Sequence, residues 1–153
     1  MNQETTKENS KNPFWIFDDC LEWQKYLMTL YEAMFFKNLL KYATKKGYIV
    51  CPKVRVSDII TIERKRWHRR WNFIGRPWIV SAKLDRLHVD FLLIKEKGLT
   101  TVCAIELDDK THDSQERKKA DNIKNKAFEN AWIRLIRFNT SNVSEEEFEK
   151  RGI

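Results

Sequence analysis

Two acidic residues interrupt apolar, strand-like segments in the middle of the sequence. Asp90 lies in the run LHVDFLLI, and Glu106 lies in the run TVCAIELDD. A charge in an apolar strand costs free energy unless it is compensated, and a divalent metal ion is the simplest compensation. Carboxylate oxygens suit Mg²⁺ or Mn²⁺, which can polarise a phosphodiester and lower the pKa of a bound water. The alternative is that these acids end strands in solvent or pair with lysines.

The segments that carry the two acids are predicted to be neighbouring strands, over residues 87–94 and 101–107. They are joined by the short charged stretch KEKG, which is compatible with a hairpin. Side chains alternate between the faces of a strand, so Asp108 shares a face with Glu106. If the strands pair, Asp90 and Glu106 lie close together on the same face of the sheet.

The remaining elements follow from hydrophobic periodicity and capping signals. A first helix is predicted from the low 20s to Lys46, with Gly47 as its C-cap. Its apolar stripe comprises Leu27, Leu30, Tyr31, Met34, Phe35, Leu39, Tyr42 and Ala43. A strand over 48–56 follows, and Pro52 assigns it to a sheet edge or a bulge. A short helix is expected from Ser57.

The C-terminal half continues the alternation of helices and strands. A helix is predicted over 114–130, a strand over 132–138, and a final helix over 144–150 with Ser144 as its N-cap. This order predicts an α/β fold with a mixed central β-sheet flanked by helices.

Length, charge and cysteine content limit the classes of protein. The chain of 153 residues predicts one domain over 14–153 after a flexible tail over 1–13. A formal net charge of +7 favours a polyanionic partner such as DNA. The three cysteines are widely spaced and are expected to be reduced. No apolar run is long enough to span a membrane, so a cytoplasmic location is expected.

A basic, tryptophan-rich excursion over 63–80 is the second feature with chemical meaning. Its cations and indole rings are Arg64, Lys65, Arg66, Trp67, Arg69, Arg70, Trp71, Arg76 and Trp78. Cations neutralise phosphates, and indole rings stack on unpaired bases or wedge between base steps. These residues are therefore predicted to contact DNA. The alternative is that the tryptophans anchor the excursion to the core while the arginines are solvated.

Several motifs together resemble the PD-(D/E)XK nuclease superfamily. They are Glu32 in the first helix, VDFLLI, AIELDDKTHD, a basic helix containing Asp121, and IRLIRF. The chain is more closely similar to the domain-of-unknown-function family 2726 and to very-short-patch-repair-like endonucleases, including the EDxHD homing endonucleases. The resemblance implies a restriction-endonuclease-like core with a metal-dependent active site at acidic strand ends.

The resemblance also implies roles for individual residues. Asp90 corresponds to the metal-binding aspartate of the superfamily, and Glu106 corresponds to the acid of its (D/E)XK half-motif. Asp108 stands where that motif has lysine, and a carboxylate cannot stabilise an attacking water or a phosphorane as lysine does. His112 becomes the candidate general base or phosphate ligand. As an alternative, His112 is an ordinary polar surface residue.

Further catalytic candidates come from the two helices. Asp121 is placed to orient the histidine, and Glu32 is placed to close the site from the first helix. Ordinary alternatives are a surface ion pair for Asp121 and a solvated position for Glu32. Ala120 stands where many family members carry an arginine, so either a nearby lysine supplies the positive charge or activity is reduced. The candidates are Lys118, Lys119 and Lys124, of which the first two are also predicted to contact DNA.

Three functions are compatible with these features. The favoured one is a Mg²⁺- or Mn²⁺-dependent endonuclease that cleaves or nicks DNA. The alternatives are a catalytically inactive nuclease-fold module that binds nucleic acid, and a protein-interaction module built on the tryptophans. DNA repair, restriction, phage and mobile-element roles all remain open. A homodimer or a targeting partner protein is compatible with the sequence.

Overall fold

A mixed four-stranded sheet forms the centre of the protein, in a computed structural model that describes residues 26–62, 77–108 and 115–153. The strands stand in the order β1 (Tyr48–Arg55), β2 (His88–Lys95), β3 (Thr101–Leu107) and β4 (Leu135–Phe138). The first three pair antiparallel, while β3 and β4 pair parallel. The predicted mixed α/β class and the pairing of the two acid-bearing strands are confirmed.

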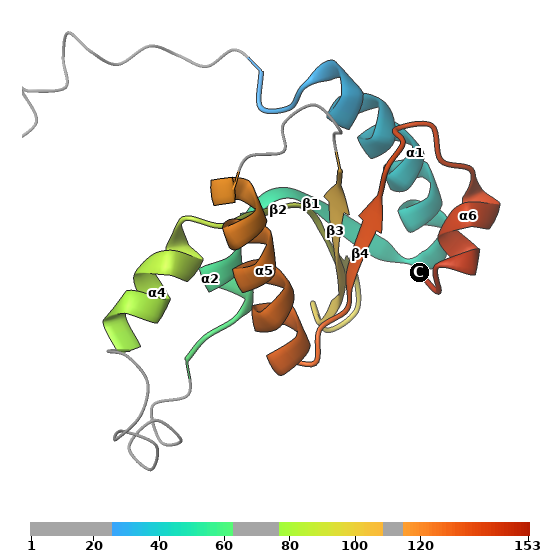
Figure 1. Ribbon diagram of the computed structural model, residues 1–153. Helices are drawn as coiled ribbons and strands as arrows, with labels where there is room; N and C mark the ends of the chain where they lie inside the picture. Colours follow the sequence, from blue (N-terminus) through green and yellow to red (C-terminus); the bar gives the residue numbers. More distant parts are fainter. Residues whose placement is uncertain (1–25, 63–76, 109–114) are drawn as a thin grey trace, which may run out of the picture.

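Helices cover both faces of the sheet (Figure 1). On one face lie α1 (Leu30–Lys46) and α6 (Glu145–Lys150). On the other lie α5 (Gln115–Asn130), α2 (Val56–Ile59) and α4 (Pro77–Asp85). Among the described ranges, no helix is both long and apolar enough to cross a membrane.

An aromatic cluster fixes the position of α1 on the sheet. The ring of Phe35 lies 5.1 to 5.7 Å, centroid to centroid, from the rings of Phe91, Phe138 and Phe148. All four side chains are almost inaccessible to solvent. Buried aromatic side chains in this geometry contribute strongly to core stability. The cluster therefore connects α1, β2, β4 and α6.

The first helix begins later than the sequence predicts. Thr29 is its N-cap and exchanges hydrogen bonds with Glu32 in a capping box, so residues 26–28 lie outside the helix. Several residues of the predicted apolar stripe are exposed, both before the helix, with Leu27 at 64%, and in its first turn, with Leu30 at 87%. The predicted C-cap is confirmed, because Gly47 has the left-handed conformation with φ 70°.

Two further expectations need correction. The predicted excursion includes the start of a helix, because α4 begins at Pro77, a residue that suits the first turn of a helix. The last strand begins at Leu135 instead of residue 132, because Trp132 has φ 57° and cannot continue a ladder. Two other predictions are confirmed. The strand that contains Pro52, β1, lies at the edge of the sheet, and Ser144 is the N-cap of α6.

Candidate active site

A row of four charged residues crosses the sheet, one from each strand. Lys53 on β1 falls opposite Asp90 on β2, between two paired positions of the antiparallel register. Asp90 in turn falls opposite Glu106 on β3, one residue beyond the last paired position. Glu106 pairs with Arg137 on β4. We call Lys53, Asp90, Glu106 and Arg137 the charged row.

The backbone of β1 has an unusual conformation at Lys53, the first residue of the charged row. Lys53 has φ 53°, which is uncommon for a residue with a Cβ, and it follows Pro52, which has no N–H to donate. Such a conformation costs of order 1 kcal/mol or more and is often found at functional sites. The regular ladder pairing is interrupted at Lys53, whose side chain makes polar contacts with two acids.

Lys53 joins two carboxylates from different elements. Its Nζ donates hydrogen bonds to Glu32 Oε1 and, at 3.0 Å, to Asp90 Oδ1. The other Asp90 oxygen, Oδ2, accepts a hydrogen bond from the backbone N–H of Leu107 at 2.8 Å. The first turn of α1 is thereby tied to β1, and Asp90 is tied to the end of β3.

The electrostatics of this group favour its charged forms. Burial alone would raise the pKa of Glu32, but the hydrogen bonds from Lys53 and Thr29 outweigh it and lower that pKa. Burial alone would lower the pKa of Lys53, but the contacts with Glu32 and Asp90 outweigh it and raise that pKa. An ammonium group and two carboxylates are therefore stable together at this end of the charged row.

Glu106 lies deeper than the other acids and has its own lysine. Lys124 Nζ on α5 donates a hydrogen bond to Glu106 Oε1 at 2.6 Å, and each side chain is only 10% exposed. Burial raises the pKa of Glu106 to about 7, and the nearby charge of Asp90 acts in the same direction. Lys124 and Arg137 oppose this rise without cancelling it.

Arg137 ends the charged row and connects β4 to two further acids. Its Nη1 donates to Asp108 Oδ1 at 2.6 Å, and its Nη2 donates to Asp121 Oδ1 at 3.2 Å and Asn125 Oδ1 at 3.1 Å. Burial would lower the pKa of Arg137, but the hydrogen bonds and negative charges of Asp108 and Asp121 outweigh it and raise that pKa. The guanidinium fork suits this bridging role, since it presents several donors in one plane.

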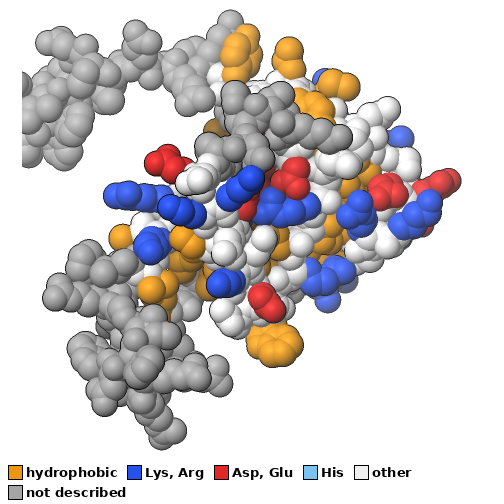
Figure 2. All heavy atoms as spheres, in the orientation of Figure 1, with side chains coloured by type: hydrophobic (Ala, Val, Ile, Leu, Met, Phe, Trp, Pro, Cys, Tyr) orange, Lys and Arg blue, Asp and Glu red, His pale blue; other side chains and the backbone are white. Residues whose placement is uncertain are grey.

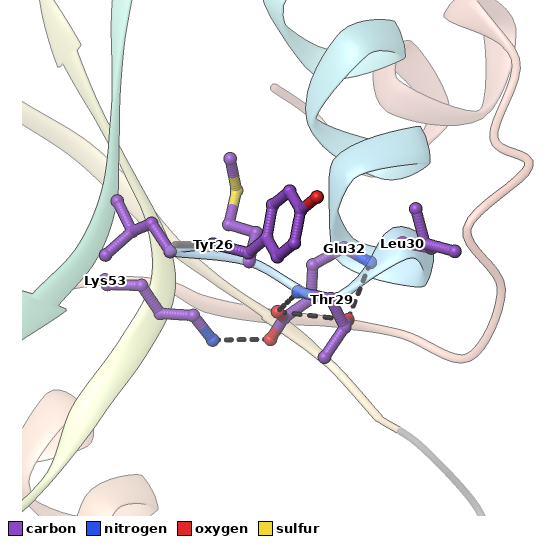
Figure 3. A pocket seen from close by; sticks show the side chains of 7 residues that line it. Tyr26, Thr29, Leu30, Glu32 and Lys53 are labelled. Carbon is purple, nitrogen blue, oxygen red and sulfur yellow. Dashed lines mark hydrogen bonds and ion pairs between the residues drawn. The ribbon is translucent and has the colours of Figure 1, made fainter. Parts of the chain in front are cut away.

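A pocket gives access to the Lys53 end of the charged row (Figure 3). Glu32 and Lys53 line it together with residues before and at the start of α1. These residues are Tyr26, Leu27, Met28, Thr29 and Leu30. The Lys53–Glu32 ion pair therefore forms the charged part of the pocket wall, and the rest of the wall is partly apolar.

The structure brings together five of the six predicted catalytic residues. Asp90 and Glu106 belong to the charged row, and Glu32, Asp108 and Asp121 each contact one of its basic members. The solvated-position alternative for Glu32 is wrong, because its side chain is only 15% exposed. Lys124 is one of the three lysines predicted to replace the arginine that is missing at Ala120. Its ammonium group donates a hydrogen bond to Glu106.

Other predicted site residues lie outside the described residues. They are His112 and the excursion residues Arg64, Lys65, Arg66, Trp67, Arg69, Arg70, Trp71 and Arg76. Lys118 and Lys119 lie exposed on α5. The proposed roles of all these residues stay predictions.

Sequence reasoning missed Lys53 and Arg137. Each is a basic residue within a predicted strand, the same signal that identified Asp90. Their partners depend on the pairing of β1 and β4 with the central strands, which local periodicity does not define.

The donor chemistry of the site suits a hard divalent cation. Glu32, Asp90 and Glu106 offer carboxylate oxygens, and Mg²⁺ is commonly held by one or two carboxylates plus substrate phosphates. In the part of the chain that the structure describes, no group of three or more His, Cys, Asp or Glu side chains forms a ready-made metal cluster. The ammonium groups of Lys53 and Lys124 lie against these oxygens instead.

Fold and site together define an α/β protein with a charged row across a mixed sheet. The family model described as "Protein of unknown function (DUF2726)" matches residues 24–153, so the chain belongs to this family. The predicted similarity to family 2726 is confirmed. Searches of curated proteins and of solved structures gave no significant match.

Proposed function

We propose that this protein is a metal-dependent endonuclease that hydrolyses DNA phosphodiester bonds, with a restriction-endonuclease-like core of the PD-(D/E)XK type. One observation carries the proposal. Asp90 and Glu106 stand opposite each other on adjacent strands, one residue beyond the Phe91–Ile105 pair of the β2–β3 ladder, and each has a lysine in contact with it. Paired carboxylates next to lysines are suited to phosphodiester chemistry, because the carboxylates provide metal ligands and the lysines provide cations for a phosphate.

Asp90 and Glu106 are the proposed ligands of Mg²⁺ or Mn²⁺, with Glu32 closing the site. A bound ion of this kind supplies a Lewis acid for the phosphodiester and lowers the pKa of a coordinated water. Asp108 stands where the motif has a lysine and cannot supply a positive charge. Lys124 supplies that charge in its place, because the ammonium group of Lys124 lies beside Glu106. Its role is to stabilise negative charge that develops on the phosphate oxygens.

The DNA-binding surface is proposed to include the exposed side of α5 and the excursion over 63–80. Lys118 and Lys119 are exposed on that helix. Figure 2 shows a band of basic side chains, with acidic ones among them, across the face that carries α5. A net charge of +7 supports attraction to a polyanion. His112 is proposed to assist the attacking water.

A second candidate function is a nucleic-acid-binding module without catalysis. It is favoured by the basic partners of the site acids, since Asp90, Glu106 and Asp108 already pair with Lys53, Lys124 and Arg137. Carboxylates neutralised in this way are stable without a metal ion. Binding would then depend on the basic surface alone.

A plasmid cleavage assay separates the two candidates. The purified protein is incubated with supercoiled and linear DNA in Mg²⁺, Mn²⁺ or EDTA, beside an Asp90→Asn, Glu106→Gln double variant. An Asp58→Asn, Glu149→Gln double variant is the matched control, because those acids form exposed surface ion pairs. Metal-dependent nicking or linearisation by wild type and control alone supports the endonuclease. DNA binding by all three proteins without cleavage supports the binding module.

A further inference from the structure

Lys53 is the shared cation of two acids of the proposed site, namely Asp90, a proposed metal ligand, and Glu32, which closes the site. A single atom, its Nζ, contacts both Glu32 Oε1 and Asp90 Oδ1. The two carboxylates are shielded, with 15% and 18% of their side chains exposed, so they depend on this charge. The ammonium group therefore marks a cation position between α1 and β2.

We infer that Lys53 is a displaceable cation that couples metal binding to phosphate binding. In the free protein it neutralises Glu32 and Asp90, and in the complex it yields its place to a divalent cation and binds a phosphate of the nucleic acid. This inference rests on the proposed function and adds to it a coupling between the two ligands. The site binds its metal ion more tightly when the nucleic acid is bound as well.

Charge balance supports the exchange. Removing Lys53 from Glu32 and Asp90 leaves two like charges together, which a divalent cation neutralises. The released ammonium group loses both of its carboxylate partners, so metal binding alone carries a cost. A phosphate of the nucleic acid restores a partner to Lys53, which makes metal and nucleic acid bind with positive coupling.

The geometry also gives Lys53 room to move. Its side chain lines the pocket at the start of α1 (Figure 3) and is 29% exposed. The four-carbon stem of a lysine is flexible. Lys124 differs, because its side chain is only 10% exposed and lies between α5 and the sheet. Lys53 is therefore the exchanging lysine, while Lys124 stays at Glu106.

Binding of Mn²⁺, followed through the electron paramagnetic resonance signal of the free ion, tests the exchange. Titrations are run with and without a short DNA duplex, after subtraction of binding to the duplex alone. For wild type, we expect the affinity for Mn²⁺ to rise about tenfold when the duplex is present. Without the duplex, Lys53→Met is expected to bind Mn²⁺ about tenfold more tightly than wild type, because the competing charge is gone.

The matched control is Lys45→Met, which removes an exposed lysine paired with Glu145 and should behave as wild type. An unchanged Mn²⁺ affinity of wild type on addition of the duplex overturns the inference, and this comparison needs no variant to fold. Lys53→Met binding Mn²⁺ no more tightly than wild type also overturns it, with Lys53→Gln as a second variant. If either of these two results is found while the protein still cleaves plasmid DNA in a metal-dependent way, the exchange by Lys53 is overturned and the proposed nuclease function is not. Absence of Mn²⁺ binding with and without DNA overturns the proposed metal-dependent function as well.

Discussion

The ammonium group of Lys124 lies 2.6 Å from Glu106 Oε1, and this buried pair joins α5 to the middle of the sheet. Lys124 shares the sheet-facing side of α5 with Phe128, one turn further along the helix. The same contact therefore contributes to the packing of the helix and places a cation at a candidate metal ligand. Stability and activity are expected to respond together when either partner changes.

Replacing Lys124 by methionine tests the structural half of this relationship. The change leaves Glu106 buried without its nearest counter-ion, which we expect to destabilise the protein by about 3 kcal/mol. Urea unfolding in EDTA measures the effect. Lys126→Met, at an exposed position of the same helix, is the control and should change stability by at most about 0.5 kcal/mol. Equal stability of the two variants would show that the Glu106–Lys124 pair does not hold the helix.

The pKa of Glu106 predicts how stability depends on pH. Burial raises this pKa from 4.5 to about 7 in the folded protein, so the folded state binds the proton more tightly than the unfolded state. The contribution of Glu106 to the free energy of unfolding is then expected to fall as pH rises from about 4.5 to about 7, by about 3 kcal/mol at roughly 1.4 kcal/mol per pKa unit. Above about pH 7 this contribution no longer changes.

Glu106→Gln removes the titrating group and should lack that loss. The difference in unfolding free energy between variant and wild type, measured by urea unfolding in EDTA, is expected to move in favour of the variant between about pH 5 and about pH 8. Glu149→Gln, an exposed acid of α6, is the control and should follow the wild type. A difference that moves in favour of the wild type would mean that Lys124 holds the pKa of Glu106 below its usual value.

The sequence predicts the central part of the site because its signals are local. Asp90 and Glu106 interrupt apolar runs, and the short link between those runs favours a hairpin, so their proximity follows from strand alternation. The same local signals do not predict the roles of Lys53 and Arg137. Their contacts require the pairing of β1 with β2 and of β3 with β4, which joins segments far apart in the chain.

The misplaced start of α1 shows two local signals in conflict. Apolar residues at helical spacing, including Leu27, extend the predicted helix towards the N-terminus, while Thr29 and Glu32 form a capping-box pattern that begins it at Leu30. The cap prevails because its two hydrogen bonds satisfy backbone N–H groups at the helix start. Leu27 and Leu30 remain exposed beside the pocket.

Arg137→Lys tests whether the guanidinium fork holds α5 against β4. A lysine cannot contact Asp108, Asp121 and Asn125 from one planar group, so we expect a loss of about 1 to 2 kcal/mol in the free energy of unfolding. Urea unfolding measures it. Arg86→Lys, at an exposed position before β2, is the control and should be close to neutral. A neutral Arg137→Lys would show that a single charge suffices there.

The salt dependence of DNA binding tests the predicted role of the basic excursion. If Arg69 and Arg70 each neutralise a phosphate, replacing both by alanine reduces the magnitude of the negative slope of log affinity against log salt concentration by about 1.8. Fluorescence anisotropy of a labelled duplex over a series of salt concentrations gives the slope. Lys41→Ala, Lys45→Ala is the matched control, because it removes the same charge at exposed lysines paired with Glu145.

The control separates direct contact from net charge. Both double variants lower the net charge equally, so a general electrostatic attraction would weaken binding by both to a similar extent. Direct phosphate contacts by the excursion predict a reduced slope only for Arg69→Ala, Arg70→Ala, since counterion release depends on the phosphates that are neutralised. Equal slopes for the two variants would place the DNA contacts elsewhere, with the exposed lysines Lys118 and Lys119 of α5 as the next residues to replace.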